Sequence, residues 1–147
     1  MMLHLYSRCN PVGNTMPQVE APHRRSFCDE AGGKVRRLKL LAVEQKVCLE
    51  ADAAVARALG RRELHRYMTL ANYRNNWLRI GFTEADLADG GSDRFIDAMV
   101  LWGDAATIGR GLRAHLEAGA DQVCIQPIHD EGDLDARDRT LTALADV

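Results

Sequence analysis

The residues best suited to contact a small molecule lie in a segment that mixes aromatic rings with side-chain amides. Tyr73, Asn75, Asn76 and Trp77 all fall within one short stretch. Apolar rings beside a few amide groups suit a pocket that is mostly apolar and has a few placed polar groups. The alternative is structural, because Tyr73 and Trp77 are four positions apart and would pack together on a helix, with the asparagines as caps. The sequence alone leaves both interpretations open.

Other catalytic patterns cannot be assembled from the sequence. It offers no Ser/His/Asp triad, no P-loop and no cysteine or histidine spacing suited to a metal. Cys48 and Cys124 lie in apolar runs and are predicted to be small core residues, which fits a reducing cytoplasm. His65 and His115 each lie beside an arginine and are predicted to be solvated. Gly90-Gly91-Ser92, at a predicted helix start, would either hold an anion or simply cap the helix.

Charge is divided unevenly along the chain. Residues 1–40 hold seven Lys/Arg against three Asp/Glu, whereas residues 41–147 hold twelve against eighteen. The larger part is therefore acidic and would repel phosphate, which argues against a nucleic-acid partner. The sequence also lacks the run of about 18 apolar residues that a membrane span needs. We expect a cytoplasmic protein with no nucleic-acid or membrane partner.

Residues 104–128 carry the clearest structural pattern. Asp104 is placed as an N-cap, and apolar residues then recur every four positions from Ile108 to Leu116, which predicts a helix with one apolar face. Gly119 can take the left-handed conformation that ends a helix. The apolar run over 123–125 predicts a strand buried on both faces, as parallel strands under helices are. This segment is one helix–strand unit of a parallel α/β protein.

The same alternation extends over residues 41–147, in contrast to the first 40 residues. Residues 1–40 hold three of the four prolines and show no sustained period, so they are predicted to form a poorly ordered or loosely packed leader that could hold one short strand over 2–6 and a short helix around 34–41. The remaining predictions are a strand over 41–49, a helix capped by Asp52, a capping box from Thr83 to Asp86, a helix capped by Ser92, a short strand at 100–102 and a last helix from about 134 to 144.

Four segments of the larger part resemble one protein superfamily. They read LAVEQKVCLEAD, YMTLANYRNNWLRIGFTEADL, GGSDRFIDAMVLWGD and TIGRGLRAHLEAGADQVCIQP, in that order. Residues 41–147 resemble the carboxyl-terminal part of the luciferase-like monooxygenase superfamily, and most of all its deazaflavin-dependent (coenzyme F420-dependent, LLM class) oxidoreductases. The last segment is similar to the superfamily's ending, where an AGADxVxxQ stretch forms the eighth barrel strand.

The resemblance implies part of a (β/α)8 TIM barrel. Such enzymes are usually homodimers that use coenzyme F420 or FMN, without a metal, for hydride transfer or oxygenation of a small organic substrate. A full barrel needs about 250 residues, so residues 41–147 would supply only its later units. Most cofactor contacts in the family come from the earlier strands, and no position here matches them. We therefore expect this chain to lack the cofactor half and to be catalytically weak.

In a barrel of this kind, chemistry takes place where the strands end. The corresponding positions here are residues 49–52 and 126–129. Gln126 is placed to donate to a substrate or cofactor oxygen, although a polar residue at a strand end can equally bond a neighbouring loop. His129 stands in an acidic loop, which favours a surface histidine over a catalytic base. The predicted substrate-binding residues are Tyr73, Asn75, Asn76, Trp77 and Gln126.

A second hypothesis belongs to another functional class. The chain would then be a catalytically inactive remnant that acts at most as a dimerising interaction module, through the exposed edge of its incomplete barrel. Sedimentation separates the two hypotheses, because a monomer at every concentration would count against the dimerising module.

Overall fold

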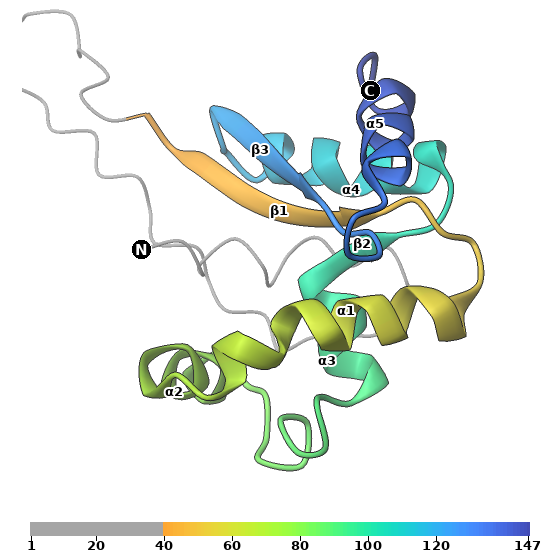
Figure 1. Cartoon of the computed structure of the whole chain (residues 1–147). Coiled ribbons are helices and arrows are strands. Elements are labelled where there is room, and N and C mark those ends of the chain that lie inside the picture. The colour runs from red at the N-terminus through yellow and green to blue at the C-terminus, as the bar shows by residue number, and fades with distance from the viewer. Residues whose placement is uncertain (1–39) are drawn as a thin grey trace, which may run out of the picture.

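The computed structural model describes residues 40–147 and builds them on a three-stranded parallel sheet (Figure 1). The predictions for the leader, including its strand over residues 2–6, lie outside the described range. The strands are β1 (Ala42–Cys48), β2 (Val100–Trp102) and β3 (Gln122–Pro127). The predicted α/β class and the three predicted strands are confirmed.

The strand order is β2-β1-β3, with the first strand in the middle. Lys46 of β1 lies opposite Val100 on one side and Gln126 on the other. Each strand of a (β/α)8 barrel is the neighbour of its successor, and that rule would place β2 between β1 and β3. The order seen here instead has β3 crossing over to the far side of β1. The order 2-1-3 is the one with which some open parallel sheets begin.

Helices cover both faces of this sheet (Figure 1). Three helices lie on one side and two on the other. Each group packs its own apolar cluster against its face of the sheet. The first side carries α1 (Ala53–Met68), α2 (Ala71–Arg79) and α3 (Asp93–Met99), and the second carries α4 (Ala105–Glu117) and α5 (Leu134–Ala143). In a barrel, all of the helices would lie on the outer face.

The larger apolar cluster lies on the side of α1, α2 and α3. Phe95 of α3 is fully buried at its centre, with its ring 4.8 Å from Trp77 and 5.1 Å from Phe82. Gly60 allows α1 to approach, because a Cβ at this position would stand 2.8 Å from the Ile96 side chain. The glycine in the middle of α1 therefore serves close packing of two helices.

The helix starts are fixed by side-chain caps at the predicted positions. Asp52 accepts from the backbone of Ala54, Ser92 from that of Phe95, and Asp104 from that of Thr107. These bonds satisfy donors that the first turn of a helix leaves free. Thr83 and Asp86 bond each other as a capping box does, but residues 83–89 form turns and not a helix.

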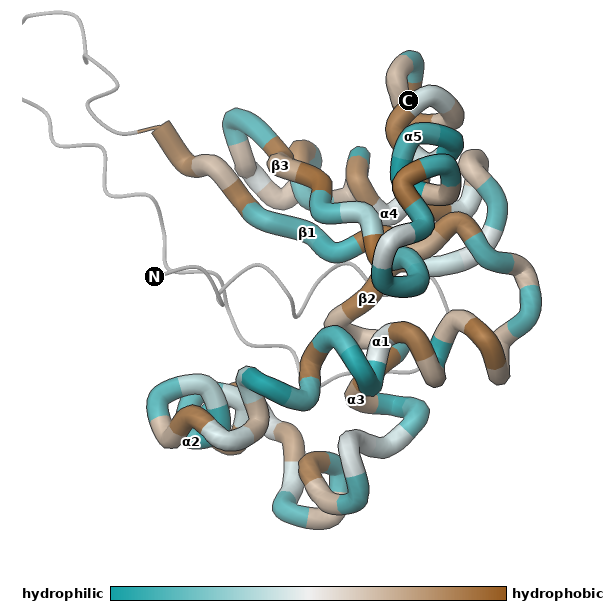
Figure 2. Tube along the Cα trace, viewed as in Figure 1, coloured by the Kyte–Doolittle hydropathy of each residue, from teal (hydrophilic) through white to brown (hydrophobic). Residues whose placement is uncertain are grey.

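β1 and β3 differ in how they are covered. β1 carries a hydrophilic middle, Glu44–Lys46 (Figure 2), of which Gln45 and Lys46 are nonetheless buried. β3 is exposed at every second residue, so the prediction of a strand buried on both faces is wrong. Cys124 is exposed and is not a core residue as predicted. The reason is the strand order, because an edge strand is covered here on the side of α4 and α5 only.

Candidate functional site

The most polar cluster of the sheet gathers around Lys46 in the middle of β1. Its ammonium Nζ donates to the Gln126 side-chain oxygen at 2.7 Å and to the Glu63 carboxylate at 2.9 Å. It also stands 5.3 Å above the ring of Tyr67. Only 8% of the Lys46 residue is exposed. We call Lys46, Glu63, Tyr67 and Gln126 the Lys46 cluster.

An aromatic row extends this cluster toward the core. The ring of Tyr67 lies 5.0 Å from that of Tyr73, which lies 5.8 Å from that of Trp77. Two of the predicted substrate residues, Gln126 and Tyr73, therefore belong to one continuous group of side chains. They come from β3 and α2, which are far apart in the sequence. The signal that could have found Lys46 was its charge inside an apolar strand.

Of the other predicted substrate residues, Trp77 is the inner end of this row, and Asn75 and Asn76 lie outside it. Trp77 is 3% exposed and packs on Phe95 in the core, and its ring contact with Tyr73 agrees with the structural alternative of a packing pair. Asn75 is exposed, and the Asn76 side chain accepts from Arg79 on the same helix. A role of these residues in substrate binding stays a prediction.

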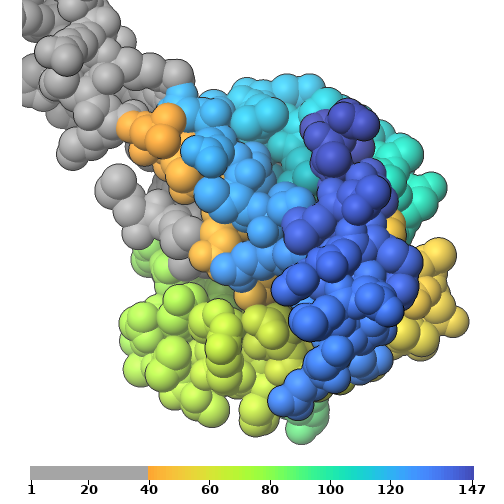
Figure 3. Space-filling view, turned by 45° about the horizontal axis from the view of Figure 1, so that its top comes forward, coloured from red at the N-terminus to blue at the C-terminus, as the bar shows by residue number. Residues whose placement is uncertain are grey.

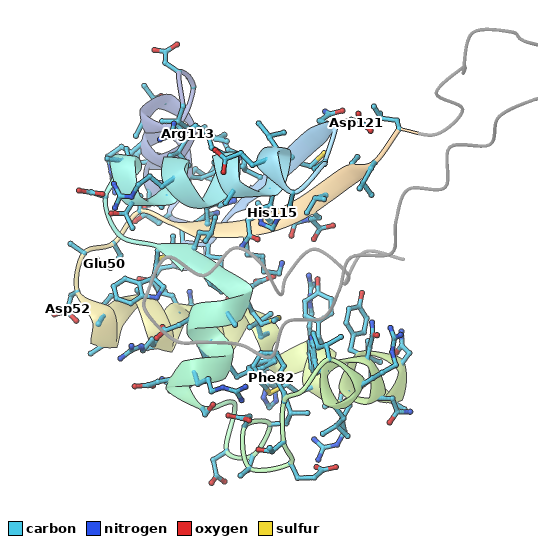
Figure 4. All side chains as sticks on the ribbon, turned by 180° about the vertical axis from the view of Figure 1, so that it is seen from behind. Glu50, Asp52, Phe82, Arg113, His115 and Asp121 are labelled. Carbon is cyan, nitrogen blue, oxygen red and sulfur yellow. The ribbon has the colours of Figure 1, made fainter. Side chains whose placement is uncertain are left out.

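A small cavity of about 170 Å³ opens where β1 and β3 end. The chain leaves β1 toward α1 on one face of the sheet and leaves β3 toward α5 on the other (Figure 1). Such a switch point is where open parallel sheets bind ligands. Glu50, which Figure 4 shows in the loop after β1, lines it together with His129 and Arg139. Both strand ends predicted to carry chemistry, 49–52 and 126–129, thus contribute to one cavity.

Two side chains of this cavity, Cys48 and His129, could in principle react, and their surroundings limit both. Burial, and to a smaller extent the charge of Glu50, raises the pKa of the Cys48 thiol to about 11. The thiol therefore stays protonated near neutral pH and is no nucleophile. The Nδ1–H of His129 donates to the Asp130 carbonyl at 2.8 Å, and Arg62 donates to the carbonyl of His129 at 2.8 Å. These bonds fix the loop after β3.

His115 is buried, and the prediction that it is solvated is wrong. It is 1% exposed on the side of α4 that faces the sheet (Figure 4), and its Nε2 lies 2.9 Å from the Gln45 side-chain oxygen. Gln45 in turn donates to the carbonyls of Lys46 and Met99. Burial lowers the pKa of His115. The helical spacing could have shown this, since His115 follows Ile108 and Leu112 on the apolar face of α4.

The Gly90-Gly91-Ser92 segment serves as a cap. Ser92 bonds the backbone of Phe95 at the start of α3, a helix of only seven residues. A Cβ at Gly91 would stand 2.9 Å from the Phe95 ring, so the backbone lies directly on the core. Of the two interpretations that the sequence left open, the structure favours capping.

The two cavities beside β3 are too small for the cofactors that the resemblance implies. The cavity at the strand ends and a second one between α4, β3 and α5 measure about 170 and 210 Å³. Pockets for cofactor-sized ligands span about 300–1,000 Å³, so a flavin or deazaflavin ring system would not be enclosed. Within residues 40–147, no cluster of His, Cys, Asp or Glu is arranged to hold a metal ion. In the same range, no helix has the length and apolarity needed to cross a membrane.

Comparisons with known proteins leave the chain without an assigned relative. No protein-family model matches the sequence, no curated protein is significantly similar to it, and no solved structure matches the fold significantly.

Proposed function

We propose that residues 41–147 form the carboxyl-terminal part of a flavin- or deazaflavin-dependent oxidoreductase of the luciferase-like kind, and that they carry the part of its site where the substrate meets the cofactor ring. The reaction would be hydride transfer to, or oxygenation of, a small organic substrate, with coenzyme F420 or FMN. The resemblance of the four segments supports this assignment. The single structural observation behind it is the Lys46 cluster.

A charged side chain in the middle strand of a parallel sheet needs an explanation. Such strands are normally apolar on both faces, and a buried ammonium costs free energy unless it is paired. Lys46 is paired with Glu63 and Gln126, so the cost is offset, but an apolar residue would avoid it. Costly polar groups of this kind concentrate at functional sites.

The arrangement suits an organic molecule with a polar oxygen. The ammonium holds the Gln126 side chain by its oxygen, which leaves the Nε2 group of Gln126 able to donate. Tyr67 and Tyr73 add aromatic surface beside it. Orientation of the substrate is the contribution expected of the protein, while the bound cofactor supplies the redox step.

The strand order bears on this proposal. In the barrel that the resemblance implies, β2 would lie between β1 and β3, whereas here β1 and β3 are direct neighbours. The proposal therefore requires the strands to exchange neighbours when further barrel strands are present. It also expects this chain to bind cofactor weakly, since the two cavities beside β3 are smaller than a cofactor needs.

The test is a titration of the ¹⁵N-labelled full chain with coenzyme F420 and with FMN, followed by amide chemical shifts. We expect saturable shifts at Lys46, Tyr67, Tyr73 and Gln126, with a dissociation constant no tighter than about 1 mM. Gln126→Ala should abolish these shifts. The control Asn72→Ala, at an exposed position of α2 outside both the cluster and the predicted substrate residues, should leave them unchanged.

Two results would contradict the proposal. One is the lack of any saturable shift at the Lys46 cluster with either cofactor. The other is micromolar binding that Gln126→Ala leaves intact, because it would place a complete cofactor site elsewhere in the chain.

A further inference from the structure

β3 is an edge strand that presents a row of backbone groups outward. Within residues 40–147 it pairs with β1 alone. The N–H groups of Gln122 and Ile128 donate to the Leu41 and Val47 carbonyls on the β1 side. Because peptide groups alternate between the two edges of a strand, the N–H and C=O groups of Val123 and Ile125 point away from β1.

This edge lacks the features that prevent strands from pairing with other chains. Natural edge strands carry charged residues, bulges or interior prolines. β3 reads QVCIQP, with no charge, and with its proline at the last position. Figure 3 shows this part of the chain at the molecular surface beside α5. The strand is therefore a template for a further strand.

A largely apolar groove, which Arg113 also lines, runs beside the same edge. It lies between α4, β3 and α5, and Val123 and Ile125 line its floor. Two of its other residues, Leu116 and Val147, are 47% and 45% exposed. A partner on the edge of β3 would also cover this groove, and removing its apolar surface from water would stabilise the pairing.

We propose that β3 pairs antiparallel with β3 of a second copy of this chain, with Cys124 opposite the partner's Cys124. The sequence QVCIQ is symmetric in character about Cys124. In this register Val123 lies opposite the partner's Ile125 on the groove side, and Gln122 lies opposite the partner's Gln126 on the other. Two-fold symmetry makes such an interface self-complementary.

The backbone directions agree with this register. Val123 and Ile125 both point outward, so Val123 and the partner's Ile125 form a hydrogen-bonded pair and exchange both backbone bonds. Side-chain amides meet amides, apolar groups meet apolar groups, and no like charges oppose each other within the strand. A second copy is therefore the occupant that the edge fits. The inference uses only β3 and its groove, and it does not depend on the proposed oxidoreductase function.

A disulfide between the two Cys124 residues would report this register. Cys124 points its backbone groups toward β1, so it would form a non-hydrogen-bonded pair, in which the two Cα atoms are about 4.5 Å apart. A disulfide spans Cα separations of about 4.4–6.8 Å. Cys124 is exposed, and its thiol is free. Diamide, which takes up the two thiol hydrogens and their electrons, should therefore join two copies through Cys124.

The experiment uses the full chain with Cys9→Ser and Cys28→Ser, which leaves Cys124 as the exposed thiol next to the buried Cys48. We expect sedimentation equilibrium to show a reversible dimer, and diamide to convert it to a covalent one. Cys124→Ser should keep the dimer and lose the cross-link. Cys124→Lys should weaken dimerisation by about tenfold or more, because two ammonium groups would meet at the two-fold axis.

A charge-reversal pair separates this interface from a folding defect. Cys124→Glu should weaken the dimer as Cys124→Lys does, and an equal mixture of the two should recover it as a heterodimer. The proposal is overturned by a monomer at every concentration, by a dimer that Cys124→Lys leaves unchanged, or by variants that keep their circular dichroism but fail to recover on mixing.

Discussion

β1 and β3 lie side by side in one sheet, yet only one of them is covered on both faces. Val43, Val47 and Cys48 of β1 are at most 1% exposed, whereas Gln122, Cys124 and Gln126 of β3 are exposed. In the sequence each strand carries a short apolar run, over residues 47–49 at the end of β1 and over residues 123–125 in β3. Their difference comes from position, because β1 lies between two strands and two layers of helices, and β3 lies at an edge.

The comparison also explains where polar residues are tolerated. β1 buries Gln45 and Lys46, each bonded to partners from other elements. β3 keeps its amides at the surface, where water can satisfy them. Polar groups in the centre of the sheet therefore hold neighbouring elements together as well as being candidate ligands. Polar groups at the edge stay accessible to partners.

The largest expected effect is at Gln45. Gln45→Leu removes the partner of the His115 Nε2 and of the Met99 carbonyl inside the core. Leaving buried polar groups without that partner should lower the free energy of unfolding by about 3 kcal/mol. The matched change on the edge strand, Gln122→Leu, should stay within about 0.5 kcal/mol. Urea denaturation of both variants checks this, and equal losses would contradict the central position of β1.

A smaller contrast should separate two valines. Val47→Ala on β1 removes two methyl groups at a site with no exposure and should cost about 2 kcal/mol. Val123 on β3 is half-buried, so Val123→Ala should lower the free energy of unfolding by less than about 1 kcal/mol. Thermal unfolding monitored by circular dichroism gives both values. The reverse ranking would show that β3, and not β1, occupies the centre.

The pH dependence of stability tests the buried His115. Burial lowers its pKa below the ordinary 6.5, so below pH 6.5 the unfolded chain binds more protons than the folded one. The contribution of neutral His115 to the free energy of unfolding is therefore fully present above pH 6.5. It is lost as pH falls toward the folded-state pKa, with a slope of at most about 1.4 kcal/mol per pH unit. Subtracting the urea curve of His115→Gln isolates this group. Identical pH profiles would mean that His115 is not buried.

Lys46→Met should change stability least. Methionine fills a similar volume, and Glu63, whose side chain is 33% exposed, can regain water, so the loss should stay below about 1 kcal/mol. The same variant should abolish the cofactor-dependent shifts at Gln126. Arg110→Met, at an exposed position of α4 on the other side of the sheet, is the control and should keep them. A stable Lys46→Met protein that keeps the cofactor-dependent shifts would show that the Lys46 cluster is not part of the binding site.

Local structure was predictable because short-range rules decide it. The caps at Asp52, Ser92 and Asp104 follow from residues that bond the first turn of a helix. Gly119, with a φ of 104°, ends α4 as its position predicted. The three strands were found from their apolar runs.

Strand order and burial were not predictable in the same way. The helix after β2 can carry the chain to either side of β1, and the sequence of β3 does not say which edge it will occupy. The burial of Cys124 was therefore misjudged. His115 was misjudged for another reason, since its arginine neighbour outweighed the helical spacing that placed it on the apolar face of α4. The Lys46 cluster joins residues 80 positions apart, which no local pattern encodes.

Residue-resolved amide hydrogen exchange of the full chain tests the central claim, that β1 is the covered centre of the sheet and β3 its open edge. In dilute protein, the account predicts slow exchange of Lys46 and Val47, where β1 has a neighbouring strand on both sides, and an alternating pattern in β3. In β3 the amides of Cys124 and Gln126, which face β1, exchange slowly, and those of Val123 and Ile125 exchange fast until concentration brings two copies together. Slow exchange of Val123 and Ile125 at every concentration, or fast exchange of these two residues of β1, would contradict it.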